Sequence, residues 1–347
     1  MNKKQLKIII ALLAVIVVLL LVAGGLVIGL FVLAPQQKTP ENATISADNG
    51  EWSLDNLKVG RVTAIDSDIQ YSAYIGSIEE AEAELRAYGV EQRKKYDNPK
   101  VEKIEKRIEK KYGIFAVNLG EMDVETAKDV EKAVKYMYKR YPMLKGKLTN
   151  ITLSNINSFK NGHIALTQYR EYIVNGDFSQ TPYVMKFEIL LSASMFLNRE
   201  ELLKKCAEGA ETNYWPEGMD ISTLVVHELS HQVLNAYMMN YFGYEDVYYV
   251  TDDNRDGFSY YITDGLKMNQ TVAKMVVDEA YNQWEKDNPG KSYEDFCKSI
   301  SGYAQGIKED GGVSYSETVA EALADIYLNG KKASKASQAI ENVLIGK

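Results

Sequence analysis

Histidine and cysteine are scarce in this chain of 347 residues, which has three histidines and two cysteines. Cys206 and Cys297 are too few for a disulfide framework or a cysteine zinc cluster. We treat them as structural residues, and a disulfide between them stays open. The 48 acidic residues outnumber the 40 basic ones. The chain therefore lacks the basic balance typical of nucleic-acid binding, and we expect no nucleic acid partner.

Charge is absent from the segment Ile8–Ala34. Its 27 residues exceed the roughly 20 that a helix needs to cross a bilayer, so we predict a transmembrane anchor here. A cleaved signal peptide is the alternative, although its apolar core is usually only about 7–15 residues long. Lys3, Lys4 and Lys7 precede the segment and predict a cytoplasmic tail at 1–7, with the rest of the chain outside the cell.

The remainder of the chain is divided by composition. Residues 35–60 are polar and punctuated by proline and glycine, which predicts a tether. A helical N-terminal segment at 61–125 follows, broken at Pro99, and the rest, 126–347, forms one domain. In that domain we predict helices at 126–141 and 199–210 and strands at 148–154, 163–174 and 185–197. This order of elements indicates an α+β fold.

The most specific pattern is VVHELSHQV at 225–233, which holds two of the three histidines. On a helix, His227 and His231 lie one turn apart and can bind one metal ion, while Glu228 can address a water on that metal. The alternative is an ordinary helix whose histidines pair with carboxylates. We favour a zinc site because the motif is specific and is flanked by core-type residues.

A catalytic zinc needs a third protein ligand, and the segment 313–330 offers candidates. Glu317, Glu321 and Asp325 recur every four residues, and the alanines between them allow close packing against another helix. The alternative is a capping box beginning at Ser314, in which Glu317 reaches back to a backbone amide. We favour Glu317 as the ligand because the upstream motif has to be completed.

Three motifs together resemble one protein family. HELSH at 227–231, SGYA at 301–304 and ETVAEA at 317–322 are similar to the catalytic domain of anthrax toxin lethal factor and related bacterial zinc peptidases. The likeness spans about residues 120–330. It implies a zincin-like (gluzincin) fold with a small mixed sheet and a pair of zinc-binding helices. The resemblance implies that His227, His231 and Glu317 are the zinc ligands and that Glu228 is the base. It also implies that Tyr303 donates a hydrogen bond in the transition state and that Glu321 hydrogen-bonds to a ligand.

The mechanism follows from charge. Zinc lowers the pKa of its water toward ~7, Glu228 takes the proton and gives it to the leaving amine, and Tyr303 stabilises the oxyanion. For Tyr303 the alternative is a buried aromatic residue, with Tyr315 as the donor. Glu321 is expected to accept the outer N–H of His227 and fix its tautomer.

A second metal pattern lies between the two zinc helices. Asp252, Asn254 and Asp256, followed by Gly257, match the start of a calcium loop. Thr263 stands where the twelfth loop position requires an acidic residue, so a polar turn is the favoured alternative.

These patterns predict a membrane-anchored, extracytoplasmic zinc endopeptidase that acts on a peptide or protein substrate at the cell surface. The alternative is a non-catalytic cell-envelope domain with a structural or degenerate metal site. Glu228 favours the enzyme, because a structural zinc needs no adjacent base and closes its fourth position with protein. We expect the substrate to pair as an extended strand with a sheet edge at Phe187–Phe196.

Overall fold

The structure of the chain, a computed structural model, describes residues 65–66, 69–70, 72–75, separate positions between 83 and 94, 98–154, 163–173, 182–241, 247–249, 257–305 and 314–346. The chain divides into two compact units, Met1–Thr44 and Ile45–Lys347, and the described residues all belong to the second. The predicted tail, anchor and tether therefore lie outside the described residues. Within the described ranges, no helix combines the length and apolar content that crossing a membrane requires.

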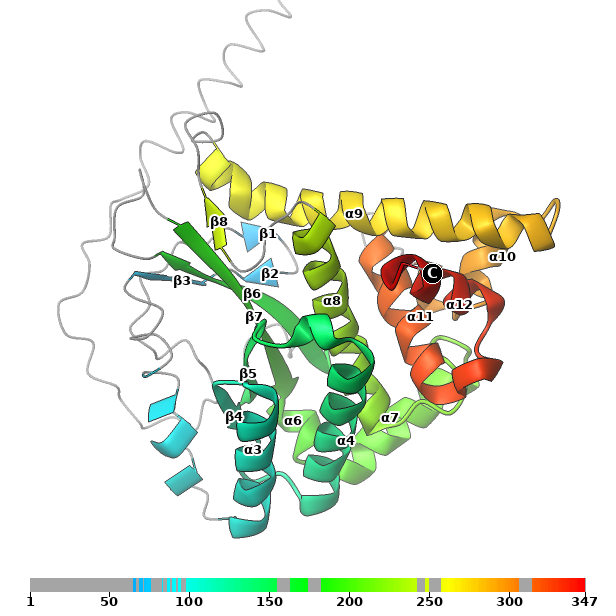
Figure 1. The fold of residues 1–347 in the computed structure, drawn as a ribbon. Helices are drawn as coiled ribbons and strands as arrows, with labels where there is room; N and C mark the ends of the chain where they lie inside the picture. The colour runs from blue at the N-terminus through cyan, green and yellow to red at the C-terminus, as the bar shows by residue number, and fades with distance from the viewer. Residues whose placement is uncertain are drawn as a thin grey trace, which may run out of the picture. The chain divides into compact units, whose positions relative to one another are not determined.

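A mixed sheet occupies one side of the described unit (Figure 1). Its strands are β3 (Ser72–Ile75), β4 (Ala116–Asn118), β5 (Leu148–Ser154), β6 (Ala165–Ile173), β7 (Pro182–Ser192) and β8 (Val247–Tyr249). Their order is β3-β6-β7-β5-β4, with β8 also paired to β7. Antiparallel pairing joins β7 to β6 and β8, and the other pairs are parallel. A separate antiparallel pair is formed by β1 (Ile65–Asp66) and β2 (Ile69–Gln70).

Two helices on the N-terminal side have clear sequence boundaries. Helix α3 (Pro99–Tyr112) begins after Asn98, whose side chain accepts the amide of Val101, and ends at Gly113, which adopts φ 72°. Helix α4 (Val124–Arg140) is capped by Asp123 and buries an apolar stripe. The predicted break at Pro99 and the predicted helix at 126–141 are confirmed.

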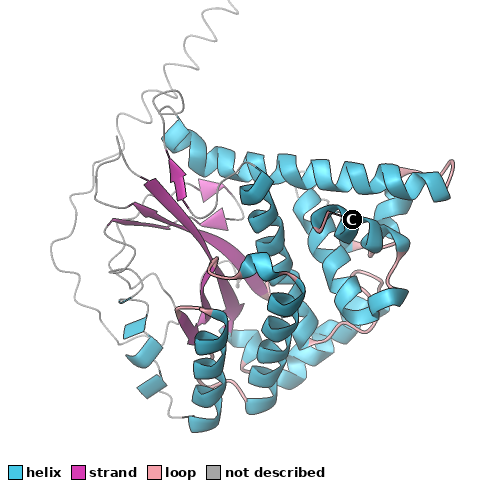
Figure 2. Cartoon of the chain, in the orientation of Figure 1, coloured by secondary structure: helices cyan, strands magenta, loops and turns pink. Residues whose placement is uncertain are grey.

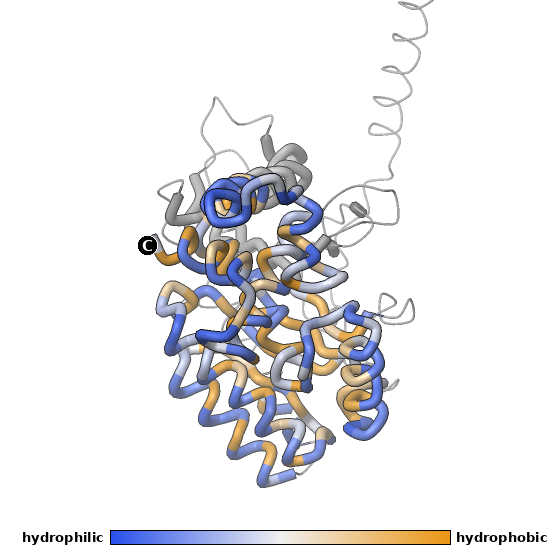
Figure 3. The backbone as a smooth tube through the Cα atoms, turned by 90° about the vertical axis from the view of Figure 1, so that its right-hand side faces the viewer, coloured by the Kyte–Doolittle hydropathy of each residue, from blue (hydrophilic) through white to orange (hydrophobic). Residues whose placement is uncertain are grey.

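The remaining helices are α6 (Ala193–Phe196), α7 (Arg199–Glu211), α8 (Ile221–Tyr241), α9 (Gly257–Asp287), α10 (Tyr293–Lys298), α11 (Tyr315–Asn329) and α12 (Lys335–Leu344). Of these, α6 and α8 contact the sheet, and α10, α11 and α12 lie on the far side of α8 from it (Figure 2). Short 3-10 turns are η2 (Pro142–Leu144), η4 (Tyr303–Gln305) and η5 (Gly330–Lys332). Helix α8 packs against α11, α4 and β6, and α9 packs against α12 and α11. Hydrophilic and hydrophobic residues alternate along the helices, as amphipathic packing requires (Figure 3).

Two predictions about the third strand are wrong. Strand β7 ends at Ser192, and the rest of the segment predicted as strand at 185–197 forms α6. The segment is also no sheet edge, because β7 pairs with β6 on one side and with β5 and β8 on the other. Strand order depends on contacts between distant segments, which local hydrophobicity does not specify. The expected α+β organisation with a small mixed sheet is confirmed.

Candidate metal centre

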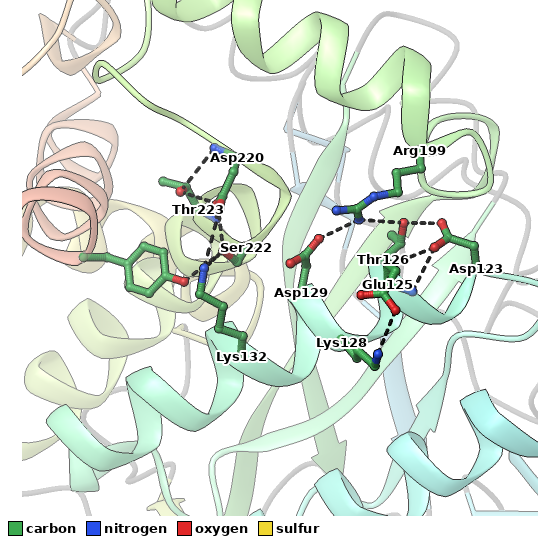
Figure 4. Close-up of polar contacts among 11 residues, drawn as sticks. Asp123, Glu125, Thr126, Lys128, Asp129, Lys132, Arg199, Asp220, Ser222 and Thr223 are labelled. Atoms are coloured by element: carbon green, nitrogen blue, oxygen red, sulfur yellow. Dashed lines mark hydrogen bonds and ion pairs between the residues drawn. The ribbon is translucent and has the colours of Figure 1, made fainter.

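Helix α8 presents the two histidines of the HELSH motif. Asp220 precedes the helix, and its Oδ1 accepts the amide of Thr223 at 2.8 Å (Figure 4). Ser222 and Thr223 lie in the first turn of the helix and donate their hydroxyls to Asp220. The apolar residues around the motif are fully buried, among them Val225, Val226, Leu229 and Val233. Burial of nearly the whole circumference holds α8 rigidly inside the domain.

Helix α11 supplies the acidic side of the centre. It packs directly against α8, and the alanines that separate its acidic residues are fully buried. Small side chains let the two helix backbones approach closely, which brings Glu317 and Glu321 to the histidines. The predicted pair of helices around a metal-capable group is therefore confirmed.

His227, His231 and Glu317 form a group that can hold one metal ion. One ligand atom from each lies within 4.8 Å of the other two. Oε2 of Glu317 is 3.1 Å from Nε2 of His227 and 3.6 Å from Nε2 of His231. Two imidazole nitrogens and one carboxylate oxygen that converge in this way are a donor set that suits zinc.

The pKa values of Glu317 and His227 are set by burial and by their charged partners. Burial alone would raise the pKa of Glu317, yet the positive charge of His231 and hydrogen bonds from both histidines bring the pKa well below its usual range. Burial would lower the pKa of His227, but hydrogen bonds with Glu317 and Glu321 raise it well above the usual value. The centre thus concentrates negative charge around the imidazoles, which also favours a bound cation.

Glu321 orients His227 from behind. Oε1 of Glu321 is 2.8 Å from Nδ1 of His227, and its Oε2 accepts the hydroxyl of Ser301 at 2.7 Å. Ser301 in turn accepts the amide of Ala304 at 3.0 Å. Because a carboxylate only accepts, Nδ1 carries the proton and Nε2 faces the centre. This arrangement matches the role expected for Glu321.

Glu228 lies beside the centre without contributing to the donor set. Its side chain is buried, and the hydroxyl of Thr167 on β6 lies 2.8 Å from Oε2 and 2.9 Å from the main-chain oxygen of Glu228. Sequence reasoning missed Thr167, because a hydroxyl in a β-rich run gives no signal that it faces a particular helix.

Tyr303 lies at the centre, next to His227. The Tyr303 ring is stacked near His227, with centroids 6.0 Å apart and planes 27° from parallel. The charge of Glu317, burial and the neighbouring Tyr214 raise the pKa of Tyr303 far above the usual value. Tyr315 contacts Tyr293 and lies under the ammonium of Lys274. Tyr303 is therefore placed near the metal-capable group.

The segment before α8 holds Tyr303 in place, which sequence reasoning also missed. The amides of Gly302 and Tyr303 donate to the carbonyls of Asn213 and Tyr214, both at 2.8 Å. The Tyr214 and Tyr303 rings are 4.9 Å apart. A Cβ at residue 302 would lie 2.7 Å from the Asn213 oxygen, so this close pairing requires glycine.

The other sequence candidates lie apart from the centre. The Ser314 side chain makes no cap bond to α11, so the capping box considered for Glu317 is absent there. Asp325 is buried and accepts Ser334 and Ser337, which ties α11 to α12. Cys206 and Cys297 are free and buried. The calcium motif at Asp252, Asn254 and Asp256 lies outside the described residues.

Comparison with known proteins gives no match: no family model, curated protein or solved structure is similar to this chain. The likeness to lethal factor therefore rests on the three motifs.

Proposed function

We propose that this chain is a membrane-anchored, extracytoplasmic zinc endopeptidase. The observation that supports it is the convergence of His227, His231 and Glu317, with the carboxylate of Glu228 on the same helix and outside the donor set. Three protein ligands leave one position of a tetrahedral zinc open, and this is typical of catalytic sites. A base beside the ligands has a use only where water is to be activated.

Zinc fits the donor set, and two imidazoles and a carboxylate of this chain would hold it. When bound, zinc supplies Lewis acidity, which makes water nucleophilic near neutral pH and polarises a carbonyl. The protein contributes the orientation of its own groups. Glu321 holds the Nδ1 proton of His227, so that Nε2, which contacts Glu317, is the nitrogen that would bind the metal.

Glu228 is the proton carrier in this proposal. Its carboxylate accepts a proton from the attacking water and then delivers it to the leaving amine of the cleaved peptide. The Thr167 hydroxyl holds Oε2 on the side of β6, and this restricts the rotamers of the carboxylate. Burial limits competing bulk water around it.

Tyr303 is the donor to the oxyanion. Its raised pKa keeps the hydroxyl protonated at neutral pH, so it can donate a hydrogen bond to negative charge that develops on the carbonyl oxygen. The backbone pairing with Asn213 and Tyr214 fixes where the ring stands. This preorganisation makes the bond effective in the transition state.

The substrate strand belongs on β6 in place of the predicted edge at Phe187–Phe196. Strand β3 pairs with residues 170–173 of β6, and β2 also contacts β6. Within the described part of the chain, residues 165–169 form ladder pairs with β7 alone. Thr167 lies in this stretch and contacts Glu228. An extended peptide paired here would pass beside the proposed base, through main-chain hydrogen bonds that tolerate many sequences.

The test combines metal analysis with cleavage. The full-length protein, purified in a nonionic detergent, is analysed for bound metals and incubated with a peptide library. We expect about one zinc per chain, cleavage of internal peptide bonds, and loss of cleavage in Glu228→Gln with zinc retained. Zinc without any cleavage in the wild-type protein would support the non-catalytic alternative instead.

A further inference from the structure

Helices α3 and α4 enclose a basic groove away from the metal centre. The groove has a volume of about 750 Å³. Its lining residues are six cationic side chains, one tyrosine and one carboxylate: Arg107, Lys110, Lys111, Lys128, Lys132, Lys135, Tyr112 and Glu131. This concentration of positive charge stands out in a chain whose net charge is −8.

The charges of α3 are segregated between its two sides. Glu105 and Glu109 turn toward β4, where they accept the amides of Leu119 and Val117 and lie beside Arg93. Lys110 and Lys111 are thus left on the groove side without these two carboxylates. A solvated helix face usually intersperses both signs of charge. In the groove lining, Glu131 is the single carboxylate among six cationic side chains.

Some of the groove cations already have partners. Arg107 makes a two-pronged contact with Glu131, at 2.8 and 2.6 Å. Lys128 pairs with Glu125 at 2.7 Å. Lys132 lies 3.6 Å from a carboxylate oxygen of Asp220 and 3.3 Å from the hydroxyl of Ser222 (Figure 4).

The remaining lysines are available. Lys110 and Lys135 have no ion pair to any residue in the ranges that the structure describes, and Lys111 lies over the ring of Tyr112. Lys110 and Lys111 are in the last turn of α3, where positive charge complements the helix dipole, and this accounts for their presence there. The helix dipole does not account for the positive charges of Lys128 and Lys132, which lie in the first half of α4.

We propose that the groove binds soluble inorganic polyphosphate, a chain of linked phosphate groups. Lys128, Lys132 and Lys135 follow the spacing i, i+4, i+7 and so form one stripe along α4, about 10 Å long. A stripe suits a chain of anionic groups better than a single ion. Ammonium groups act as point charges for phosphate, and the guanidinium of Arg107, the group best shaped for carboxylates, is occupied by Glu131.

The experiment measures binding of inorganic polyphosphate to the full-length protein in a nonionic detergent, by calorimetry at two salt concentrations. We expect binding that weakens as salt rises, because opposite charges are screened. Changing Lys110, Lys111, Lys128 and Lys135 to Gln should weaken binding at least about tenfold. A matched control changes Lys204, Lys205, Lys331 and Lys332 to Gln and should bind as the wild-type protein does. Circular dichroism verifies that each variant is folded.

If the four substitutions together unfold the domain, a variant with two substitutions tests the proposal instead. The double variant Lys110→Gln, Lys135→Gln removes two positive charges without breaking an ion pair among the described residues. It should still weaken polyphosphate binding several-fold. Three outcomes would overturn the proposal: no binding of polyphosphate, equal weakening in the control, or equal affinity for polyglutamate of the same length. Binding to vesicles of anionic phospholipid without binding to polyphosphate would also overturn it, because the ligand would then be a membrane surface.

Discussion

Thr167 on β6 and Glu228 on α8 meet through the threonine hydroxyl, which lies within hydrogen-bond distance of both the carboxylate and the main-chain oxygen of Glu228. This contact joins the sheet to the metal helix at the residue next to His227. It gives β6 two roles in the proposed peptidase, as the strand that receives the substrate and as the support of the base.

Replacing Thr167 with Val should therefore impair catalysis without removing metal. Valine has nearly the same shape but no hydroxyl, so Oε2 of Glu228 loses its partner and samples other rotamers. We expect the maximal rate to fall about 10- to 100-fold with little change in KM, and Thr167→Ser to retain most activity. Steady-state kinetics with metal analysis measures this. An unchanged rate in Thr167→Val would exclude the positioning role.

The two glutamates of α11 should differ in their effect on metal content. Glu317→Ala leaves two histidines as ligands, so zinc should be lost during dialysis against a mild chelator. Glu321→Ala keeps all three donors and should weaken zinc affinity only about 10- to 100-fold. Metal analysis of both variants after identical dialysis compares them. The reverse order of metal loss would show that the ligand is one helical turn further along α11.

Tyr303→Phe should lower the maximal rate far more than it changes KM. The hydroxyl is proposed to bond to charge that exists only in the transition state, and removal of one such donor costs about 10²–10³-fold in rate. Tyr315→Phe is the matched control, because that residue contacts Tyr293 and Lys274. If Tyr315→Phe is the slower variant, the donor has been assigned to the wrong tyrosine.

Glu105 should make folding stability depend on pH. Burial raises its pKa from an ordinary 4.5 to about 7, although hydrogen bonds from the Leu119 amide and the charge of Arg93 oppose this. The folded state therefore binds the proton more tightly, and the stability from Glu105 is present at acidic pH and lost as pH rises from 4.5 through about 7. The full change is about 3 kcal/mol at most.

Glu105→Gln isolates this effect. The amide oxygen can still accept the amides of Leu119 and Gly120, but the side chain no longer titrates. Urea unfolding at several pH values should show the variant gaining stability relative to the wild-type protein as pH rises. The exposed Glu121→Gln serves as the control. A constant difference between Glu105→Gln and the wild-type protein across this range would contradict the assignment.

Much of the local structure could be predicted because its signals are local. Pro99 and Gly113 mark the ends of α3, and the β-rich run at 148–154 coincides with β5. The metal group could be predicted as well, since helical spacing places two histidines on one face and a second acidic helix had to complete the set. The four-residue repeat gave three acidic candidates, and the need to complete the histidine motif favoured Glu317 among them.

The rest depends on contacts between distant segments. Strand order decides which edge is open, and no periodicity within β6 or β7 reveals that β7 lies between neighbours. Thr167 and Tyr214 act on residues 61 and 89 positions away, through a hydroxyl and a main-chain carbonyl that no short motif marks.

The pairing of Gly302 and Tyr303 with Asn213 and Tyr214 also offers a way to observe the centre without any substrate. Two amides that donate to carbonyls exchange with deuterium only when this pairing opens. The same pairing fixes Tyr303 next to His227, and Ser301, immediately before it, bonds to Glu321. Slow exchange at residues 302 and 303 would therefore report that both loops are assembled around the histidines, and a rise in their exchange rate would report opening of the centre long before the helices unfold.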